Sequence, residues 1–181
     1  MDDIQVIDNF LDEKYFKELQ ETIFDPMFTW QKVYTESHHP HGFLFSHPIF
    51  ITSPVAWTKI GEFKEIRSPW FPKFFPFFKK LKMLSLIRIK VNLLSRTEER
   101  VTHEWHRDVC HPTDCPNIRN AKNSILYMNT NNGVTILEDT KEEIKSVANR
   151  LITFSSAISH TGTTHTDKDI PDRCLINFNY F

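Results

Sequence analysis

The chain has 181 residues, enough for one domain with a substantial core and too few for two ordinary domains. Its formal net charge is −1 and its charged residues are spread along the chain, which argues against nucleic acid as a partner. The three cysteines (Cys110, Cys115 and Cys174) cannot all pair, and the acidic start contains no apolar signal segment. No apolar run approaches the roughly 18 residues of a membrane span. We therefore expect a cytoplasmic protein with no membrane association.

The first half of the chain predicts mixed structure. Residues 4–10 alternate as a strand does, and Asp12 is placed to cap a helix that runs to about Phe24. The apolar face of this helix consists of Tyr15, Phe16, Leu19 and Ile23. Residues 28–34 predict another strand.

Residues 36–48 are rich in His, Pro and Ser and predict a loop. We interpret His38, His39, His41 and His47 as part of this loop over a barrel mouth, rather than as a metal site. Residues 54–66 and 71–83 predict helices, although Pro72 and Pro76 lie inside the second.

From residue 84 onward the periodicity changes to that of strands. Short apolar runs cover residues 84–94, 123–129, 134–137, 150–154 and 174–181, separated by turn residues such as Gly133 and Gly162. This spacing is typical of a sandwich or barrel, with the helices of the first half covering one face. We expect a single domain over residues 1–181, in which residues 1–83 support a β-barrel core of residues 84–181.

Two of these strands carry a polar side. Arg88, Lys90 and Asn92 alternate with apolar residues in the first, and Arg173, Asn177 and Asn179 do so in the last. Ordinary solvent exposure is one interpretation, because antiparallel sheets often face water on one side. A polar barrel interior is the interpretation that we favour for Arg173 and Asn177.

The most informative motif is His106-x-Asp108 followed by a distant histidine, either His160 or His165. In a strand, residues two apart point to the same side, so His106 and Asp108 can bind one ion together. Two histidines and one carboxylate leave metal positions open, which is typical of non-haem Fe(II) enzymes. The short motif is weak by itself, because His165 and Asp167 form a second pair. No histidine follows that pair, so it cannot lead the same order.

Two other metal patterns are incomplete. Cys110, His111 and Cys115 lack the second ligand pair of a closed zinc site, so we expect free thiols in a loop. The histidines of the HEWH segment, His103 and His106, are one residue too close for a zinc-peptidase helix. His103 is interpreted either as a residue that orients a ligand or as a partly exposed strand residue.

Four ordered segments, WHRD, SILYMNTNNGVTILED, NRLITFSSAISHTGTTH and DRCLINFNYF, resemble the Fe(II)/2-oxoglutarate-dependent oxygenases. The resemblance is specifically to the prolyl-4-hydroxylase-like branch of small stand-alone enzymes that are often encoded by phages. The resemblance covers residues 86–181 well and the first half poorly. It implies a mostly β fold with flanking helices, namely a double-stranded β-helix, or jelly-roll, cupin-like barrel. For a phage-encoded enzyme the location would be the host cytoplasm.

The resemblance also implies the ligands of the site. It makes His106, Asp108 and His160 the Fe(II) ligands, and His160 is preferred to His165, which is then an exposed loop residue. Arg173 matches the basic residue that binds the far carboxylate of 2-oxoglutarate, for which a planar guanidinium is well suited. Tyr127 matches a tyrosine that contacts the same co-substrate. The gap between His160 and Arg173 is longer than in many relatives.

Asn177 and Asn92 are weaker candidates for contact with the co-substrate, and each can equally be a barrel-lining residue. The implied reaction uses Fe(II), 2-oxoglutarate and O2, with ascorbate as a possible further cofactor, to hydroxylate a C–H bond. A prolyl residue in a peptide or protein is the first choice of substrate. Alternatives are a free amino acid or another small molecule, or a non-catalytic barrel used for binding or virion structure.

A nucleic-acid demethylase of the same superfamily is disfavoured, because Asn179 stands where that branch has a second arginine. The segments 36–48 and 110–122 are where we expect substrate specificity. The sequence does not predict the oligomeric state.

Overall fold

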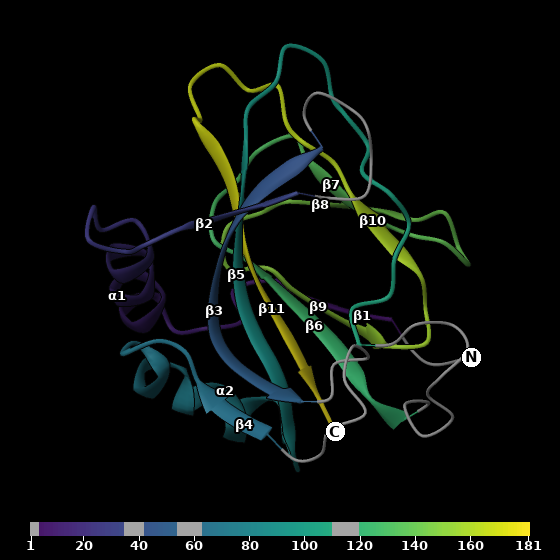
Figure 1. Cartoon of the computed structure of the whole chain (residues 1–181). Coiled ribbons are helices and arrows are strands. Elements are labelled where there is room, and N and C mark those ends of the chain that lie inside the picture. The colour runs from purple at the N-terminus through teal and green to yellow at the C-terminus, as the bar shows by residue number, and fades with distance from the viewer. Residues whose placement is uncertain (1–3, 35–41, 54–62, 110–119) are drawn as a thin grey trace.

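Two β-sheets face one another in the computed structural model, which describes residues 4–34, 42–53, 63–109 and 120–181 (Figure 1). The larger sheet has the strand order β1-β9-β6-β11-β5-β3-β2, and β4 pairs with β3 outside that path. Its strands are β1 Gln5–Ile7, β2 Gln31–Tyr34, β3 Phe43–Ser53, β4 Phe63–Ile66, β5 Leu86–Ser95, β6 Lys122–Tyr127, β9 Leu151–Ser155 and β11 Asp172–Tyr180. The smaller sheet has the order β10-β7-β8, with β10 His160–Gly162, β7 Val134–Leu137 and β8 Glu143–Lys145. The strand pairs of both sheets are antiparallel.

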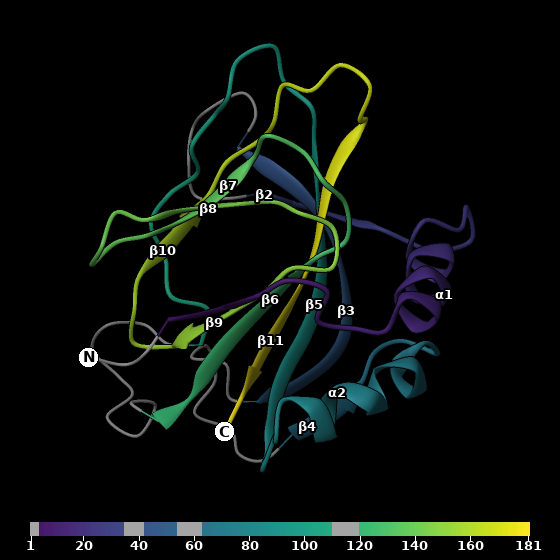
Figure 2. The same ribbon diagram turned by 180° about the vertical axis from the view of Figure 1, so that it is seen from behind.

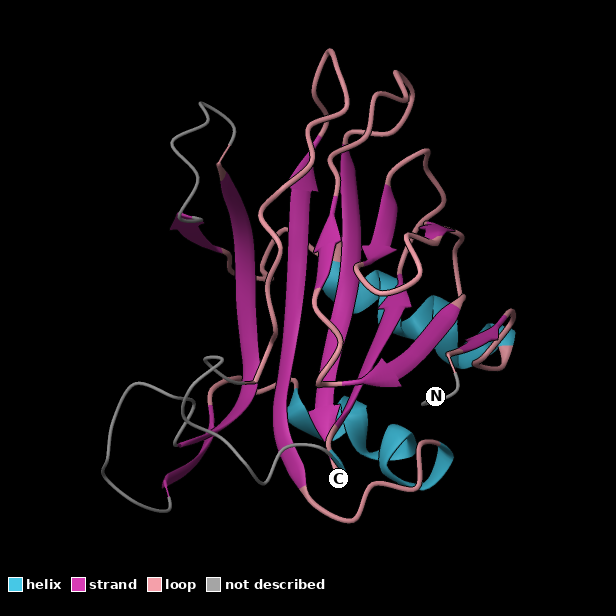
Figure 3. Ribbon diagram, turned by 90° about the vertical axis from the view of Figure 1, so that its right-hand side faces the viewer, coloured by secondary structure: helices cyan, strands magenta, loops and turns pink. Residues whose placement is uncertain are grey.

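Helices cover the outer face of the larger sheet, away from the smaller one. These helices are α1 Glu13–Ile23, the short 3-10 helix η1 Phe71–Phe74 and α2 Phe75–Lys80. Figure 2 shows β5 and β11 between the helices and the smaller sheet, and Figure 3 shows the helices on one side of the strands. Two apolar clusters result from this arrangement. One lies under the helices and includes Leu19, Phe77 and Phe178, and the other lies between the sheets and includes Ile125 and Phe154.

The alternation of β5 and β11 separates these two environments. Phe178 pairs with Ile89 on the helix-covered face, and the neighbouring Asn177 pairs with Lys90 on the face toward the smaller sheet. Arg173, on the same inner face, is only 1% exposed. The polar sides of the two strands therefore line the interior between the sheets, as we predicted for Arg173 and Asn177.

Helix α1 begins where the sequence predicts. The Asp12 carboxylate accepts a hydrogen bond from the Tyr15 backbone N–H at 2.9 Å, which satisfies one of the free donors of the first turn. Phe16, Leu19 and Ile23 are buried against the large sheet, as their helical spacing indicates.

The helix predicted at residues 71–83 is two short helices, η1 and α2. Pro72 and Pro76 each lie in the first turn of one of them, where a missing backbone N–H costs nothing. Pro76 therefore lies where η1 ends and α2 begins, and the segment forms two short helices in place of one long helix.

The loop predicted at residues 36–48 is wrong from Phe43 onward, because β3 occupies Phe43–Ser53. This strand pairs with β2 on one side and with β5 on the other, and those partners outweigh the turn-forming composition. The register with β5 shifts between Pro48 and Phe50, and a bulge is where a strand tolerates a proline. His38, His39 and His41 lie outside the described residues.

His47 is also not a loop residue. It lies in β3 with 7% exposure, its Nδ1 donates to the Thr29 carbonyl at 2.6 Å and its Nε2 accepts from the Ser68 hydroxyl at 2.8 Å. These contacts make it a structural core histidine.

The helix predicted at residues 54–66 is wrong for its last four residues, which form β4 and pair with β3. Residues 54–62 lie outside the described part of the chain. The three-residue strands β8 and β10 were not predicted, because three residues are too few for a period to be read. Within the described residues, no helix combines the length and the apolar character needed to cross a membrane.

Candidate metal centre

His106, Asp108 and His160 offer three ligand atoms that all lie within 4.8 Å of one another. His160 begins β10, and an isolated antiparallel bridge pairs it with His106, with backbone N–H to carbonyl distances of 2.9 Å in both directions. The Asp108 carboxylate lies 3.9 Å from His106 Nε2 and 3.8 Å from His160 Nε2. The structure thus brings together the three residues that the sequence proposed as metal ligands.

The local structure around the motif differs from the expected strand. His106 forms only the isolated bridge, and Asp108 lies in a bend. The carboxylate therefore reaches the two imidazoles through a turn of the backbone after His106, rather than through the alternation of a strand.

Both imidazoles are held by contacts outside the triad. His106 Nδ1 donates to the Glu104 carbonyl at 3.0 Å, which leaves the Nε2 lone pair directed to the triad. The rings of His160 and Phe154 pack in an edge-type arrangement with centroids 5.0 Å apart. Burial lowers the pKa of His160 to about 4, so this imidazole is neutral at pH 7 and its lone pair is available to a metal.

The side chain of Asp108 is 4% exposed and surrounded by donors. Burial alone would raise its pKa, but the positive charge of Arg88 holds the pKa well below the usual range. Arg88 Nη2 lies 2.7 Å from Asp108 Oδ1, and the amides of Asn177 and Asn179 donate to Oδ2 at 3.3 and 3.4 Å. Asp108 is therefore an anchored carboxylate at pH 7.

Arg88 was not predicted as a site residue. The Arg88 Nε also donates to the Asn179 side chain at 2.9 Å, so the guanidinium links β11 to Asp108. The alternation of β5 indicated that Arg88 lies on its polar face. It did not indicate that Arg88 pairs with Asp108, 20 positions later in the sequence.

The second pair, His165 and Asp167, lies apart from the triad and belongs to no metal-ligand group among the described residues. His165 was expected to be an exposed loop residue, which is wrong: it is fully buried, and burial lowers its pKa. The reason is that the segment after β10 packs inward, with the His165 carbonyl bonded to the Thr97 N–H at 3.0 Å. Asp167 instead accepts from the Asn132 backbone N–H at 2.7 Å.

Arg173 and Tyr127 form a second buried group on the inner face. The guanidinium lies over the Tyr127 ring at 5.6 Å, and both side chains donate to the Thr135 hydroxyl, Tyr127 at 2.8 Å and Arg173 at 3.0 Å. Arg173 also donates to the Ser146 hydroxyl at 2.7 Å and to the Thr163 carbonyl at 3.3 Å. Among the described residues, no carboxylate forms an ion pair with Arg173, so its charge is left without an anion.

Two glycines leave room for this guanidinium. A Cβ on Gly133 would lie 2.6 Å from Arg173 Cδ, and a Cβ on Gly162 would lie 3.2 Å from Arg173 Nη1. Gly162 follows His160 by two residues in β10, a distance of about 7 Å along a strand. The Arg173 group therefore lies about the length of a short dicarboxylate from the triad.

Asn177 and Asn92 are both buried on the inner face, at 5% and 7% exposure. Asn177 contacts Asp108, so the structure places it beside the candidate metal ligand rather than in the Arg173 group. Asn92, in β5, has a side-chain oxygen without a hydrogen-bond partner among the described residues.

The remaining candidates of the sequence have other positions. His103 is half-buried next to β10, and its carbonyl accepts from the Thr161 hydroxyl at 2.7 Å. Cys174 is a free, buried thiol on the helix side of β11. Cys110, His111 and Cys115 lie outside the described residues, as do residues 36–41 and 110–119 of the two segments expected to set specificity.

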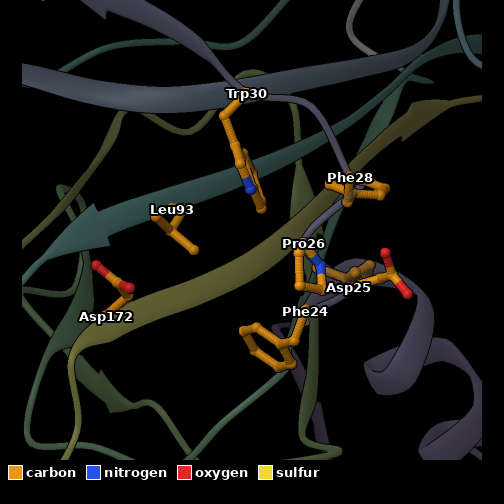
Figure 4. A pocket seen from close by; sticks show the side chains of 8 residues that line it. Phe24, Asp25, Pro26, Phe28, Trp30, Leu93 and Asp172 are labelled. Carbon is orange, nitrogen blue, oxygen red and sulfur yellow. The ribbon is translucent and has the colours of Figure 1, made fainter.

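A pocket of about 350 Å³ lies on the helix side of the large sheet, away from the triad (Figure 4). Trp30, Phe28 and Phe24 line it together with Leu93, whose side chain belongs to the outer face of β5. Because the triad and Arg173 lie on the inner face, this pocket is separate from the candidate site.

No protein-family model and no curated protein matches the sequence. Solved structures do match. An oxidoreductase of the 2OG-Fe(II) oxygenase family from Burkholderia pseudomallei is similar with a TM-score of 0.69 at 10% identity, over 98% of this chain and 84% of that chain. A Pseudomonas putida prolyl-4-hydroxylase has a TM-score of 0.62 at 12% identity, over 99% and 93%. A Trichoplax adhaerens prolyl hydroxylase, in complex with a hypoxia inducible factor peptide fragment, has a TM-score of 0.64 at 12% identity, over 98% and 83%.

The chain therefore has the double-stranded β-helix fold of these oxygenases, mostly β with flanking helices, as the sequence predicted. At such low identity the likeness shows the fold, and an activity has to be argued from the site.

Proposed function

We propose that this protein is an Fe(II)- and 2-oxoglutarate-dependent dioxygenase that hydroxylates a C–H bond. The observation that carries the proposal is the group of His106, Asp108 and His160 on a fold shared with 2OG-Fe(II) oxygenases. Three protein ligands leave coordination positions for a co-substrate and O2.

The donor set fits Fe(II). Two imidazole nitrogens and one carboxylate are ligands that Fe(II) accepts, and both the neutral state of His160 and the anionic state of Asp108 are those required. Arg88, Asn177 and Asn179 keep the carboxylate in place before a metal arrives.

Arg173 and Tyr127 fit 2-oxoglutarate. The Arg173 guanidinium is fully buried and has no carboxylate partner in the described part of the chain, which favours an anionic ligand, since a buried charge is costly when unpaired. Arg173 would bind the far carboxylate of the co-substrate, and Thr135 and Tyr127 hold the guanidinium in position.

When bound, Fe(II) and 2-oxoglutarate supply the oxidation, in which O2, 2-oxoglutarate and a C–H bond yield succinate, carbon dioxide and C–OH. The residues of the chain position the reactants and exclude water. Asp108 and His160 are nearly inaccessible, whereas the His106 side chain is 49% exposed, so substrate would approach from the side of His106. No side-chain general base is needed. Ascorbate would serve only to maintain reduced iron.

A prolyl residue in a peptide or protein is the substrate that we propose first. Two similar structures are prolyl hydroxylases, and one of them holds a peptide fragment. Trp105, next to His106, is 42% exposed and offers an aromatic surface to a peptide at this side of the site. A free amino acid is the second candidate, favoured by the half-buried Lys90 on the inner face of β5. A non-catalytic barrel is disfavoured because all three ligand residues are present.

Anaerobic addition of Fe(II) and then 2-oxoglutarate tests the proposal. We expect the visible metal-to-ligand charge-transfer band of an iron-bound 2-oxo acid in the wild-type protein. His165→Ala is the matched control, because it removes the alternative histidine and should retain the band. If His160→Ala retains the band and His165→Ala loses it, the ligand assignment is wrong. If the wild-type protein forms no band, the enzyme proposal fails.

A further inference from the structure

The inner face of β5 carries two cations beside the candidate metal centre. Arg88 pairs with Asn179 and Lys90 pairs with Asn177 in the register with β11, so both basic side chains lie on the face that contains Asp108. Arg88 forms an ion pair with Asp108 and donates a hydrogen bond to Asn179. Among the described residues, Lys90 forms no comparable ion pair.

Lys90 is half-buried, and within the described residues no carboxylate lies within ion-pair distance of its ammonium group. Burial lowers its pKa to about 8, with Arg88 as a further cause and Asp108 opposing it. At pH 7 the lysine is therefore still charged. Since a charge in such a position is unfavourable without a partner, its presence indicates an anionic partner that binds there.

The formal charges at the site with Fe(II) and 2-oxoglutarate bound also sum to a positive excess. Fe(II) and the dianion of 2-oxoglutarate cancel, and Asp108 is balanced by Arg88, while Arg173 and Lys90 remain positive. Arg173 is held at the Thr135 and Ser146 end of the interior. Lys90 is therefore available to bind an anionic group that is part of neither the iron centre nor the co-substrate.

Two polar side chains flank Lys90 with unused capacity. The side-chain oxygens of Asn92 and Asn177 are buried and have no hydrogen-bond partner among the described residues. Asn92 follows Lys90 by two positions on the same face, and Asn177 is its cross-strand partner. A ligand with N–H or O–H groups next to an anion would satisfy them.

We propose that the substrate carries a carboxylate next to a polar N–H or O–H group, and that Lys90 binds this carboxylate while Asn92 and Asn177 accept from the neighbouring donor. This inference rests on the proposed oxygenase function. The chemistry is that of an amino acid, present either as a free molecule or as the C-terminal residue of a peptide. An internal prolyl residue without a nearby carboxylate would leave Lys90 unpaired.

Matched probes test the inference by binding. L-Proline is compared with L-prolinamide, and a peptide ending in a free prolyl carboxylate with the same peptide amidated. The metal-free protein and the anaerobic complex with Fe(II) and 2-oxoglutarate are titrated by calorimetry, and the charge-transfer band reports perturbation of the iron site. We expect at least one acid to bind roughly ten- to hundredfold more tightly than its amide.

Lys90→Met should abolish this preference by weakening the acid and leaving the amide unchanged. Lys90→Arg should restore part of it, and Lys17→Met, at an exposed position of α1, is the matched control. Comparing the affinities of free proline and of the peptide with a C-terminal prolyl carboxylate shows whether the substrate is a free amino acid or the C-terminal residue of a peptide.

Three outcomes would overturn the inference. In the first, the carboxylic acids bind no better than their amides. In the second, the preference for the acids survives in Lys90→Met. In the third, Lys90→Met loses affinity for 2-oxoglutarate, which would make the lysine a co-substrate anchor. The charge-transfer band separates these results from failure of the enzyme proposal. A band without a preference for acids rejects only the carboxylate inference, whereas no band rejects the enzyme.

Discussion

The two faces of β5 and β11 have opposite compositions although they share one backbone. On the outer face, Ile89 pairs with Phe178 and both are completely buried under the helices. On the inner face, one residue along each strand, Lys90 pairs with Asn177 beside the candidate metal centre.

Physical chemistry assigns different roles to the faces. Burial of a side chain such as that of Phe178 stabilises a fold by about 1.5 to 3 kcal/mol. Buried charged and amide groups instead cost free energy unless their hydrogen bonds are complete. The outer face therefore stabilises the domain, and the inner face carries the polar groups of the candidate site at a cost in stability. Mutations on each face should separate these effects.

The largest expected effect is on the inner face, at Asp108. Asp108→Ala removes the only carboxylate of the triad and leaves Arg88 beside two imidazoles. We expect Fe(II) affinity to fall by at least about a thousandfold, or about 4 kcal/mol, measured by anaerobic calorimetry. Asp167→Ala is the control and should bind normally. Normal binding by the Asp108 variant would place the metal elsewhere.

The outer face should show its effect in unfolding. Phe178→Ala removes a ring that lies 4.5 Å from that of Phe77, and we expect a loss of about 3 to 5 kcal/mol in the free energy of unfolding. Urea denaturation of the metal-free protein measures it. Phe75→Ala, whose ring is 51% exposed, should cost much less. Equal losses for both variants would contradict the assignment of the core.

An inner-face substitution should have the opposite sign. The folded-state pKa of Lys90 is about 8, below the ordinary 10.5, so a charged Lys90 costs up to about 3 kcal/mol at pH 7. Lys90→Met should therefore stabilise the metal-free protein.

The pH dependence follows from the same pKa. Between about pH 8 and 10.5 the unfolded state holds more protons at Lys90 than the folded state does, so this residue makes wild-type stability rise with pH. The advantage of Lys90→Met should be largest below pH 8 and vanish near pH 10.5. An advantage that does not change with pH would show that packing, and not charge, is its cause.

Arg173 should show a smaller loss, measured as weaker co-substrate binding. Arg173→Gln removes charge-assisted hydrogen bonds of about 1.5 to 3 kcal/mol, so 2-oxoglutarate should bind roughly ten- to hundredfold more weakly. Arg96→Gln, at an exposed position, is the control. If 2-oxoglutarate binds the Arg173 variant with wild-type affinity, a different residue anchors it.

The sequence was most informative where structure is local. Helix α1 was predicted from Asp12 and the spacing of Phe16, Leu19 and Ile23, because a cap and a helical period involve neighbours along the chain. The strands β5, β6, β7, β9 and β11 were predicted for the same reason, whereas the three-residue strands β8 and β10 were not. Prediction failed at β3, where Pro48 and His47 indicated a loop and the pairing with β5 decided for a strand.

The sequence by itself determined the strand-rich second half, the polar alternation of β5 and β11 and the residue types of the His-x-Asp motif with a later histidine. The spacing of the motif left His160 and His165 both open and the resemblance preferred His160; the tertiary structure places His160 beside His106, through a bridge between segments 54 positions apart. It also decided that Arg88 holds Asp108 while Lys90 remains without a carboxylate partner among the described residues. Neither result follows from periodicity, because alternation indicates which side chains share a face, and only folding determines which groups from other strands meet them there.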